Sequence, residues 1–145
     1  MTPHGRSPAL CRKRIRWICG QDLKQLGKEE QKQRIADEIG NWCKSKPEYC
    51  IDIAIEYLNS GFFQEALHSL SYAKEYPLAL YYAGWCHKRM GDSGKAADFY
   101  EKADKAPAGY CFPARLEDIA VLSDACDAYP RGGMASYYLG CLYYD

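Results

Sequence analysis

Residues 61–77 read GFFQEALHSLSYAKEYP and residues 91–107 read GDSGKAADFYEKADKAP, so the second stretch repeats the landmarks of the first thirty residues later. The matched residues are all small or helix-breaking. The pairs are Gly61 and Gly91, Ala66 and Ala96, Ala73 and Ala103, Pro77 and Pro107, and, one helix earlier, Ala54 and Gly84. Agreement of this kind at one offset indicates an internal repeat.

Each copy has the pattern of two helices joined by a turn. Apolar residues at helical spacing predict helices over residues 48–59 and 62–75 in the first copy, and over 78–90 and 93–105 in the second. A glycine separates the two helices of each copy. We expect Ser93 to be the N-cap of the helix over 93–105. The small residues would let the paired helix backbones approach closely.

This pattern resembles the tetratricopeptide repeat, which runs W-x2-L-G-x2-Y, then A-x3-F, then A and P. The matching segments are Cys50-x2-Ile53-Ala54-x2-Tyr57 with Ala66-x3-Leu70, Leu80-x2-Ala83-Gly84-x2-His87 with Ala96-x3-Tyr100, and a third start at Ser136-x2-Leu139-Gly140-x2-Tyr143. The leading Trp is missing from all three, and the period is 30 residues instead of about 34. The resemblance implies an all-α fold, a short right-handed solenoid of helical hairpins.

An insertion separates the second repeat from the third start. It contains Tyr110-Cys111-Phe112-Pro113 followed by Arg115-Leu116-Glu117-Asp118-Ile119-Ala120-Val121-Leu122, and its apolar stripe predicts an extra helix over 113–128. With its flanking repeats this segment is similar to the repeat region of a bacterial family in which an uncharacterised β-rich domain, associated with carbohydrate metabolism, precedes tetratricopeptide repeats. This chain has no β-rich domain, so the carbohydrate role is not carried over.

Charge divides the chain. Residues 1–46 carry 11 basic and 5 acidic side chains, net +6, whereas residues 47–145 carry 8 and 14, net −6. We expect a basic, disordered arm over 1–21, a polar helix over 22–46 and the repeat domain over 47–145. The domain comprises repeats at about 47–77 and 78–107, the inserted helix and a half repeat at 133–145. Arg12-Lys13-Arg14, with Arg16 and Trp17, could contact phosphates, but such short runs are usually solvated tails, and we expect no nucleic-acid partner.

Cellular location follows from what the sequence lacks. Charges interrupt every apolar run near the N-terminus before it reaches the length of an export signal, and no stretch approaches the ~20 apolar residues that cross a bilayer. The eight cysteines form no C-x-x-C pair, and we expect them to be reduced and mostly buried in a cytoplasmic protein that makes no membrane contact. The chain stops where the third repeat should continue, so we expect a fragment, or self-association through the incomplete repeat.

The candidate binding site lies on the first helix of each repeat, because these helices line the concave surface of a tetratricopeptide solenoid. The expected partner-binding residues, spaced so that they share one face, are Ile51, Ile55, Leu58, Tyr81, Trp85, Lys88 and Arg89. This apolar and aromatic face suits a peptide with hydrophobic anchors or the chain's own N-terminal helix. Both alternatives remain open at this point.

No residue pattern predicts catalysis, a metal site or a cofactor. Cys86 and His87 are adjacent, but neighbouring residues on a helix point about 100° apart, which disfavours a thiol–imidazole pair. The three histidines are scattered, so neither a metal site nor a catalytic triad is expected. We therefore expect a non-enzymatic scaffold or adaptor that binds a protein or peptide, with Lys88 and Arg89 steering acidic partners. The alternative is an accessory repeat fragment of a larger bacterial carbohydrate-metabolism protein, whose repeat face packs on a missing domain.

Overall fold

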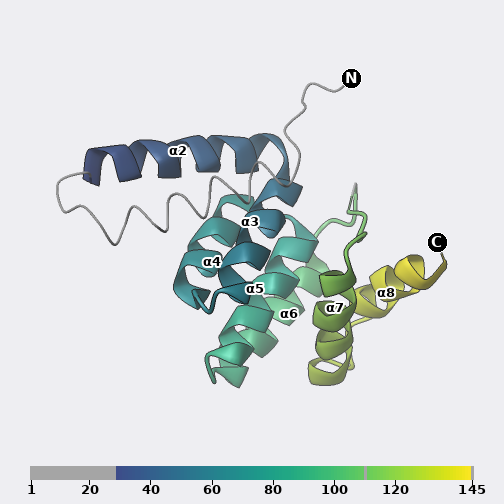
Figure 1. The fold of residues 1–145 in the computed structure, drawn as a ribbon. Helices are drawn as coiled ribbons and strands as arrows, with labels where there is room; N and C mark the ends of the chain where they lie inside the picture. Colours follow the sequence, from purple (N-terminus) through teal and green to yellow (C-terminus); the bar gives the residue numbers. More distant parts are fainter. Residues whose placement is uncertain (1–28, 110, 145) are drawn as a thin grey trace.

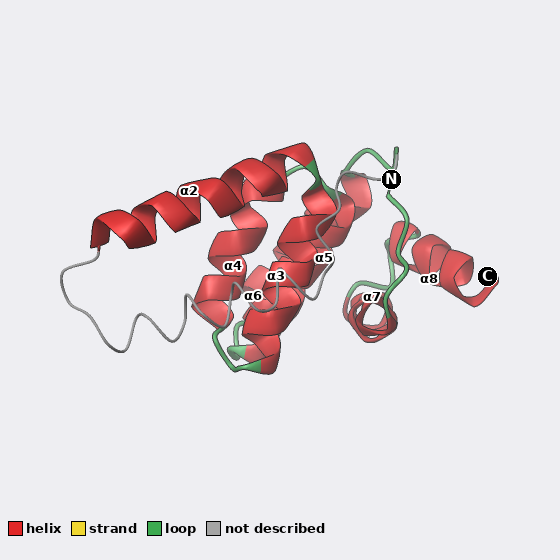
Figure 2. Cartoon of the chain, turned by 45° about the horizontal axis from the view of Figure 1, so that its top comes forward, coloured by secondary structure: helices red, strands yellow, loops and turns green. Residues whose placement is uncertain are grey.

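A computed structural model of the chain describes residues 29–109 and 111–144, and these residues form helices and connecting turns without a strand (Figure 1; Figure 2). The elements are α2 (Glu29–Ser45), α3 (Pro47–Asn59), α4 (Phe63–Leu70), the 3-10 helix η1 (Ser71–Ala73), α5 (Pro77–Arg89), α6 (Ser93–Lys105), α7 (Leu116–Ala128) and α8 (Met134–Tyr144). The all-α prediction is confirmed. None of these helices combines the length and apolar character needed to span a membrane.

The turns of the two predicted hairpins share one geometry. Gly61 and Gly91 have positive φ angles of 81° and 89°, which glycine adopts without steric cost. After α3, the amides of Gly61 and Phe62 bond back to the carbonyls of Leu58 and Tyr57, at 3.1 and 2.8 Å. After α5, Gly91 and Asp92 repeat these bonds to Lys88 and His87. Both are Schellman turns, and they reverse the chain so that α3 pairs with α4 and α5 with α6.

One predicted cap, and two helix ends by more than one residue, differ from the structure. The cap of α6 is Asp92 and not Ser93, because the Asp92 carboxylate accepts a 3.0 Å bond from the Lys95 amide. The expected helix over 62–75 is α-helical only to Leu70 and continues as the tighter 3-10 helix η1, which ends at Ala73. The inserted helix starts at Leu116 and not at 113, because Arg115 is extended and serves as its N-cap residue.

Helices α5 and α6 approach each other closely. A Cβ added to Gly84 would lie 2.5 Å from Cε1 of Tyr100 and 3.2 Å from the carbonyl oxygen of Ala96. Ala66 and Ala96, on α4 and α6, are buried in the core. Gly84 therefore lies against the partner helix of the second hairpin, as the sequence predicts.

The two hairpins, α3–α4 and α5–α6, form a layer of four helices. Helix α2 covers one end of this layer, and α7 and α8 cover the other (Figure 1; Figure 2). Helix α2 packs on α3, α4 and η1, with Gly40 directly beneath the ring of Tyr72. Helix α7 packs on α5 and on α8. The outer face of α8 is exposed at Tyr137, Tyr143 and Tyr144. The predictions for residues 1–28, including the basic arm and the start of the polar helix, lie outside the described residues.

Replacing Gly84 with Ala should lower the free energy of unfolding by about 1–3 kcal/mol, because the new methyl group overpacks the contact with Tyr100. Gly140 is the matched control, since it is the corresponding residue of the third repeat start and a Cβ there meets no described atom within 4 Å. Gly140→Ala should instead raise the free energy of unfolding by up to about 1 kcal/mol. Urea denaturation followed by circular dichroism measures both changes, and equal effects would contradict the close approach.

Candidate functional site

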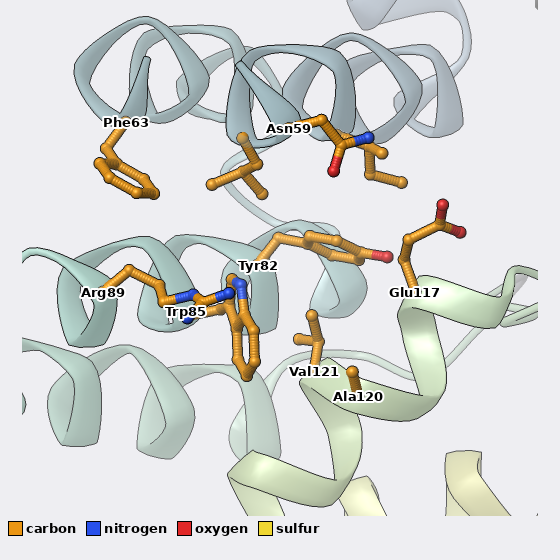
Figure 3. Close-up of a pocket in the computed structure, with 10 residues that line it drawn as sticks. Asn59, Phe63, Tyr82, Trp85, Arg89, Glu117, Ala120 and Val121 are labelled. Atoms are coloured by element: carbon orange, nitrogen blue, oxygen red, sulfur yellow. The ribbon is translucent and has the colours of Figure 1, made fainter. Parts of the chain in front are cut away.

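A groove opens between α3, α5 and α7, with a volume of about 170 Å³ (Figure 3). We call it the α7 groove. Its lining residues come from three parts of the chain. They are Ile55, Leu58, Asn59 and Phe63 from the first hairpin, Tyr82, Trp85 and Arg89 from α5, and Glu117, Ala120 and Val121 from α7.

The groove has apolar walls and charged residues of opposite sign on its two banks. The Arg89 guanidinium lies 5.0 Å from the ring centre of Trp85, a cation–π contact that keeps both side chains together. Glu117 lies on α7, across the groove from α5 (Figure 3). Both charged side chains are exposed at the rim, and the floor is apolar. The arrangement can therefore bury an apolar group and contact charges beside it.

The structure brings four of the seven predicted site residues together in this groove: Ile55, Leu58, Trp85 and Arg89. Lys88 lies outside it and forms an ion pair with Asp124 of α7. The expected exposure of Ile51, Ile55 and Tyr81 is wrong, because all three are buried in the core, although Ile55 also lines the groove. The Tyr81 ring packs edge-on against Tyr138 of α8, at 6.3 Å between centroids.

The error at Ile51 and Tyr81 has a physical cause. Helical spacing identifies a shared face, but it does not show what a later segment of the chain places on that face. Here the segment after α6 crosses back to α3, where the Arg115 side chain bonds to Asp52, the neighbour of Ile51. Helix α8 then covers Tyr81.

The sequence reasoning missed the groove residues on α7, together with Tyr82, Asn59 and Phe63. Glu117, Ala120 and Val121 follow an i, i+3, i+4 pattern that marks one face of a helix. That signal was present, but it could not indicate that this face would lie opposite Trp85. The expected alternative occupant, the N-terminal helix, is elsewhere over its described part, since α2 packs on α3, α4 and η1.

The start of α7 is fixed by a fully buried carboxylate. Asp118 accepts hydrogen bonds from the Tyr82 hydroxyl at 2.5 Å and from the amides of Ala114 and Arg115 at 2.9 and 3.0 Å. The Arg115 guanidinium, 3.9 Å from Asp118, also donates to Asp52 at 2.8 Å. Burial, with the Asp118 charge beside it, raises the pKa of Tyr82, so its hydroxyl stays protonated and donates.

A second carboxylate holds α7 further along. Asp124 accepts a 2.7 Å bond from the Tyr100 hydroxyl of α6 and pairs with Lys88 of α5. The two anchors, Asp118 and Asp124, are nearly two helical turns apart, so they fix both the position and the direction of α7. The α7 bank of the groove is thus held by polar contacts to α3, α5 and α6.

The Cys86–His87 pair lies outside the groove and has no catalytic geometry. Cys86 is fully buried, and burial raises its pKa to about 12, so the thiol is protonated at neutral pH. The His87 ring stacks on Phe99 at 5.0 Å between centroids. Of the other histidines, His68 contacts the Tyr72 hydroxyl at 3.2 Å, and His4 lies outside the described residues.

Within the part of the chain that the structure describes, no cluster of three or more His, Cys, Asp or Glu side chains could hold a metal ion. The six cysteines there are free: Cys43, Cys50, Cys86, Cys111, Cys126 and Cys141.

Comparisons of the chain with protein-family models, curated proteins and solved structures give no match. Function must therefore be argued from the geometry of the groove.

Replacing Asp118 with Ala should lower the free energy of unfolding by about 2–4 kcal/mol. The change leaves the buried Tyr82 hydroxyl without its acceptor and removes a cap from the start of α7. Asp127→Ala, on the exposed end of the same helix, removes the same charge and should change stability by less than about 0.5 kcal/mol. Chemical denaturation measures both variants, and similar losses would show that Asp118 does not anchor α7.

Stability should also depend on pH through His87. Burial, and secondarily the nearby Lys95, lowers the pKa of His87, so the folded chain favours the neutral ring. Below the ordinary histidine pKa of about 6.5, the unfolded chain binds more protons than the folded chain, and the free energy of unfolding falls as the pH falls. Urea midpoints at pH 7.5, 6.5 and 5.5 should therefore decline more in the unsubstituted protein than in His87→Phe. Parallel declines would exclude this role for His87.

Proposed function

We propose that the chain is a protein-interaction module of the tetratricopeptide type, and that the α7 groove receives an apolar side chain from a bound peptide or helix. The observation that carries the proposal is the groove itself. Four residues that the repeat pattern assigns to a binding face line it together, and α7 adds a second, apolar wall.

The size of the groove favours an anchor side chain over a small-molecule ligand. Its volume of about 170 Å³ is below the roughly 300–1,000 Å³ typical of small-molecule sites. Trp and Arg, here in contact as Trp85 and Arg89, are enriched among the residues that dominate protein–protein binding energy. An apolar anchor would gain burial against Trp85, Leu58 and Val121, and the rest of the partner would lie along the rim.

Rim charges indicate which residues should flank the anchor. Arg89 and Glu117 form no ion pair with another described residue. An acidic partner residue would complement Arg89, and a basic one would complement Glu117. Lys88 does not share this role, because Asp124 already neutralises it. Of the two cations expected to attract acidic partners, Lys88 and Arg89, only Arg89 keeps this role in the proposal.

The repeat assignment is supported by the paired Schellman turns and by the small residues at the helix contacts. Helix α7 is then an addition to the repeat pattern that narrows its concave face. Three expectations stay predictions: a cytoplasmic location, self-association through α8, and an accessory role within a larger bacterial carbohydrate-metabolism protein.

A random peptide library displayed on phage tests the proposal, because selection from such a library requires no named partner. Selected peptides should share an apolar residue flanked by an acidic and a basic residue. Trp85→Ala should weaken their affinity by about thirtyfold or more, since hot-spot truncations cost about 2 kcal/mol or more. Fluorescence polarisation of a labelled peptide measures the affinity.

The matched control is Phe112→Ala, which truncates an exposed aromatic side chain that does not line the groove. This variant should bind the selected peptides like the unsubstituted protein. Circular dichroism must show that Trp85→Ala keeps its helical content. Peptides that bind the folded Trp85→Ala variant with unchanged affinity would refute the groove as the binding site.

A further inference from the structure

A second opening lies on another side of α5, between α4 and α6. Its volume is about 380 Å³, within the range of small-molecule sites. We call it the α4–α6 cleft. Its lining is mainly apolar, with two lysines among the polar groups: Leu67, Leu70, Ser71, Lys74, Ala79, Leu80, Ala83, His87, Phe99 and Lys102.

Small side chains of α5 line the floor of the cleft. Ala79 and Ala83 are buried on its floor, and Leu70 lies buried in the α4 wall. The distance along α5 from Ala79 to His87 is about 12 Å at 1.5 Å per residue. The apolar floor therefore forms a trough that extends along α5 for about two helical turns, and it suits an extended aliphatic chain.

The charge of the cleft has one sign. Lys74 follows η1 on one bank and Lys102 lies in α6 on the other, and both side chains are exposed. Lys102 contacts the Phe99 ring at 5.2 Å. Neither ammonium has an ion-pair partner among the described residues, and no Asp or Glu is among the lining residues. Lys74 directly precedes α5, and Lys102 lies in the last turn of α6, which runs back along α5 after the turn at Gly91, so both lysines lie toward the start of α5.

The few polar groups of the cleft disfavour a peptide as its occupant. A peptide in the trough would bury backbone amides that need hydrogen-bond partners. The Ser71 hydroxyl already donates its proton to the His68 carbonyl at 2.5 Å, so it cannot donate to a peptide carbonyl. An aliphatic chain makes no such demand, and a single terminal anion would satisfy the lysines.

We propose that the α4–α6 cleft binds an amphipathic carboxylate of the fatty-acid class, with its aliphatic chain over Ala79 and Ala83 and its carboxylate between Lys74 and Lys102. This site is separate from the α7 groove, and its occupancy does not depend on the proposed peptide binding. The lysines give the preference for an anion, and the apolar trough gives the preference for a chain.

Titration of the full chain with sodium decanoate below its critical micelle concentration tests this proposal. Two-dimensional amide NMR should show saturable shifts centred on Ala83, Phe99 and Lys102, with smaller effects at Ala120 and Val121 in the α7 groove. Butyrate supplies the charge without the chain and should not saturate the site. Decyltrimethylammonium supplies the chain with the opposite charge and should bind at least tenfold more weakly.

Variants separate the two parts of the site. Lys74→Gln/Lys102→Gln should weaken decanoate binding roughly tenfold, because each exposed ion pair contributes modestly. The control Lys44→Gln/Lys46→Gln removes the same charge from exposed lysines outside the cleft and should stay within about twofold. Ala83→Leu should abolish binding by filling the trough.

The lysine variants decide the question even if Ala83→Leu does not fold. The proposal is overturned by equal binding of decanoate and decyltrimethylammonium, by unchanged affinity in the Lys74/Lys102 variant, or by shifts centred on the α7 groove.

Discussion

The contact between Gly84 of α5 and the ring of Tyr100 on α6 links the packing of the second hairpin to the groove. Because Gly84 has no side chain, the Tyr100 ring can lie against the α5 backbone, closer than any Cβ would allow. This position sends the Tyr100 hydroxyl to Asp124 of α7, 2.7 Å away. A packing constraint inside the second hairpin thereby sets the place of a helix that forms one bank of the groove.

Asp118 is the second residue that fixes α7, and its burial would cost free energy if its charge were not compensated. A fully buried carboxylate is costly unless hydrogen bonds and a positive charge compensate it. Tyr82, two backbone amides and the nearby Arg115 provide that compensation, and Arg115 is itself held by Asp52 of α3. Tyr82 lies on α5 and Asp52 on α3, whereas the other partners lie directly before α7, so the complete network forms only when α3, α5 and α7 are all in place. Asp118 therefore couples the shape of the groove to the folding of the whole domain.

The sequence predicted the helices and turns well, but it did not predict which side chains would be buried by segments distant in the chain. The hairpins follow from glycine positions and apolar spacing, which act within about thirty residues, and α6 was predicted at its observed bounds of Ser93–Lys105. The site was predicted only in part. Trp85 and Arg89 were found because they share a helix face, whereas the burial of Tyr81 depends on Tyr138, more than fifty residues later in the chain. No periodicity within α5 contains that information.

The two openings can both be traced to the distribution of side-chain size around α5. This helix is apolar on several faces, as expected for one that is enclosed by neighbours. Where α5 presents the large rings of Tyr82 and Trp85, these fill most of the space below α7 and leave a groove for one side chain. Where it presents Ala79 and Ala83, between α4 and α6, the opening is larger, at about 380 Å³. The same helix thus gives the domain a small recess and a longer trough, which differ in volume, in charge and in the chemistry they can hold.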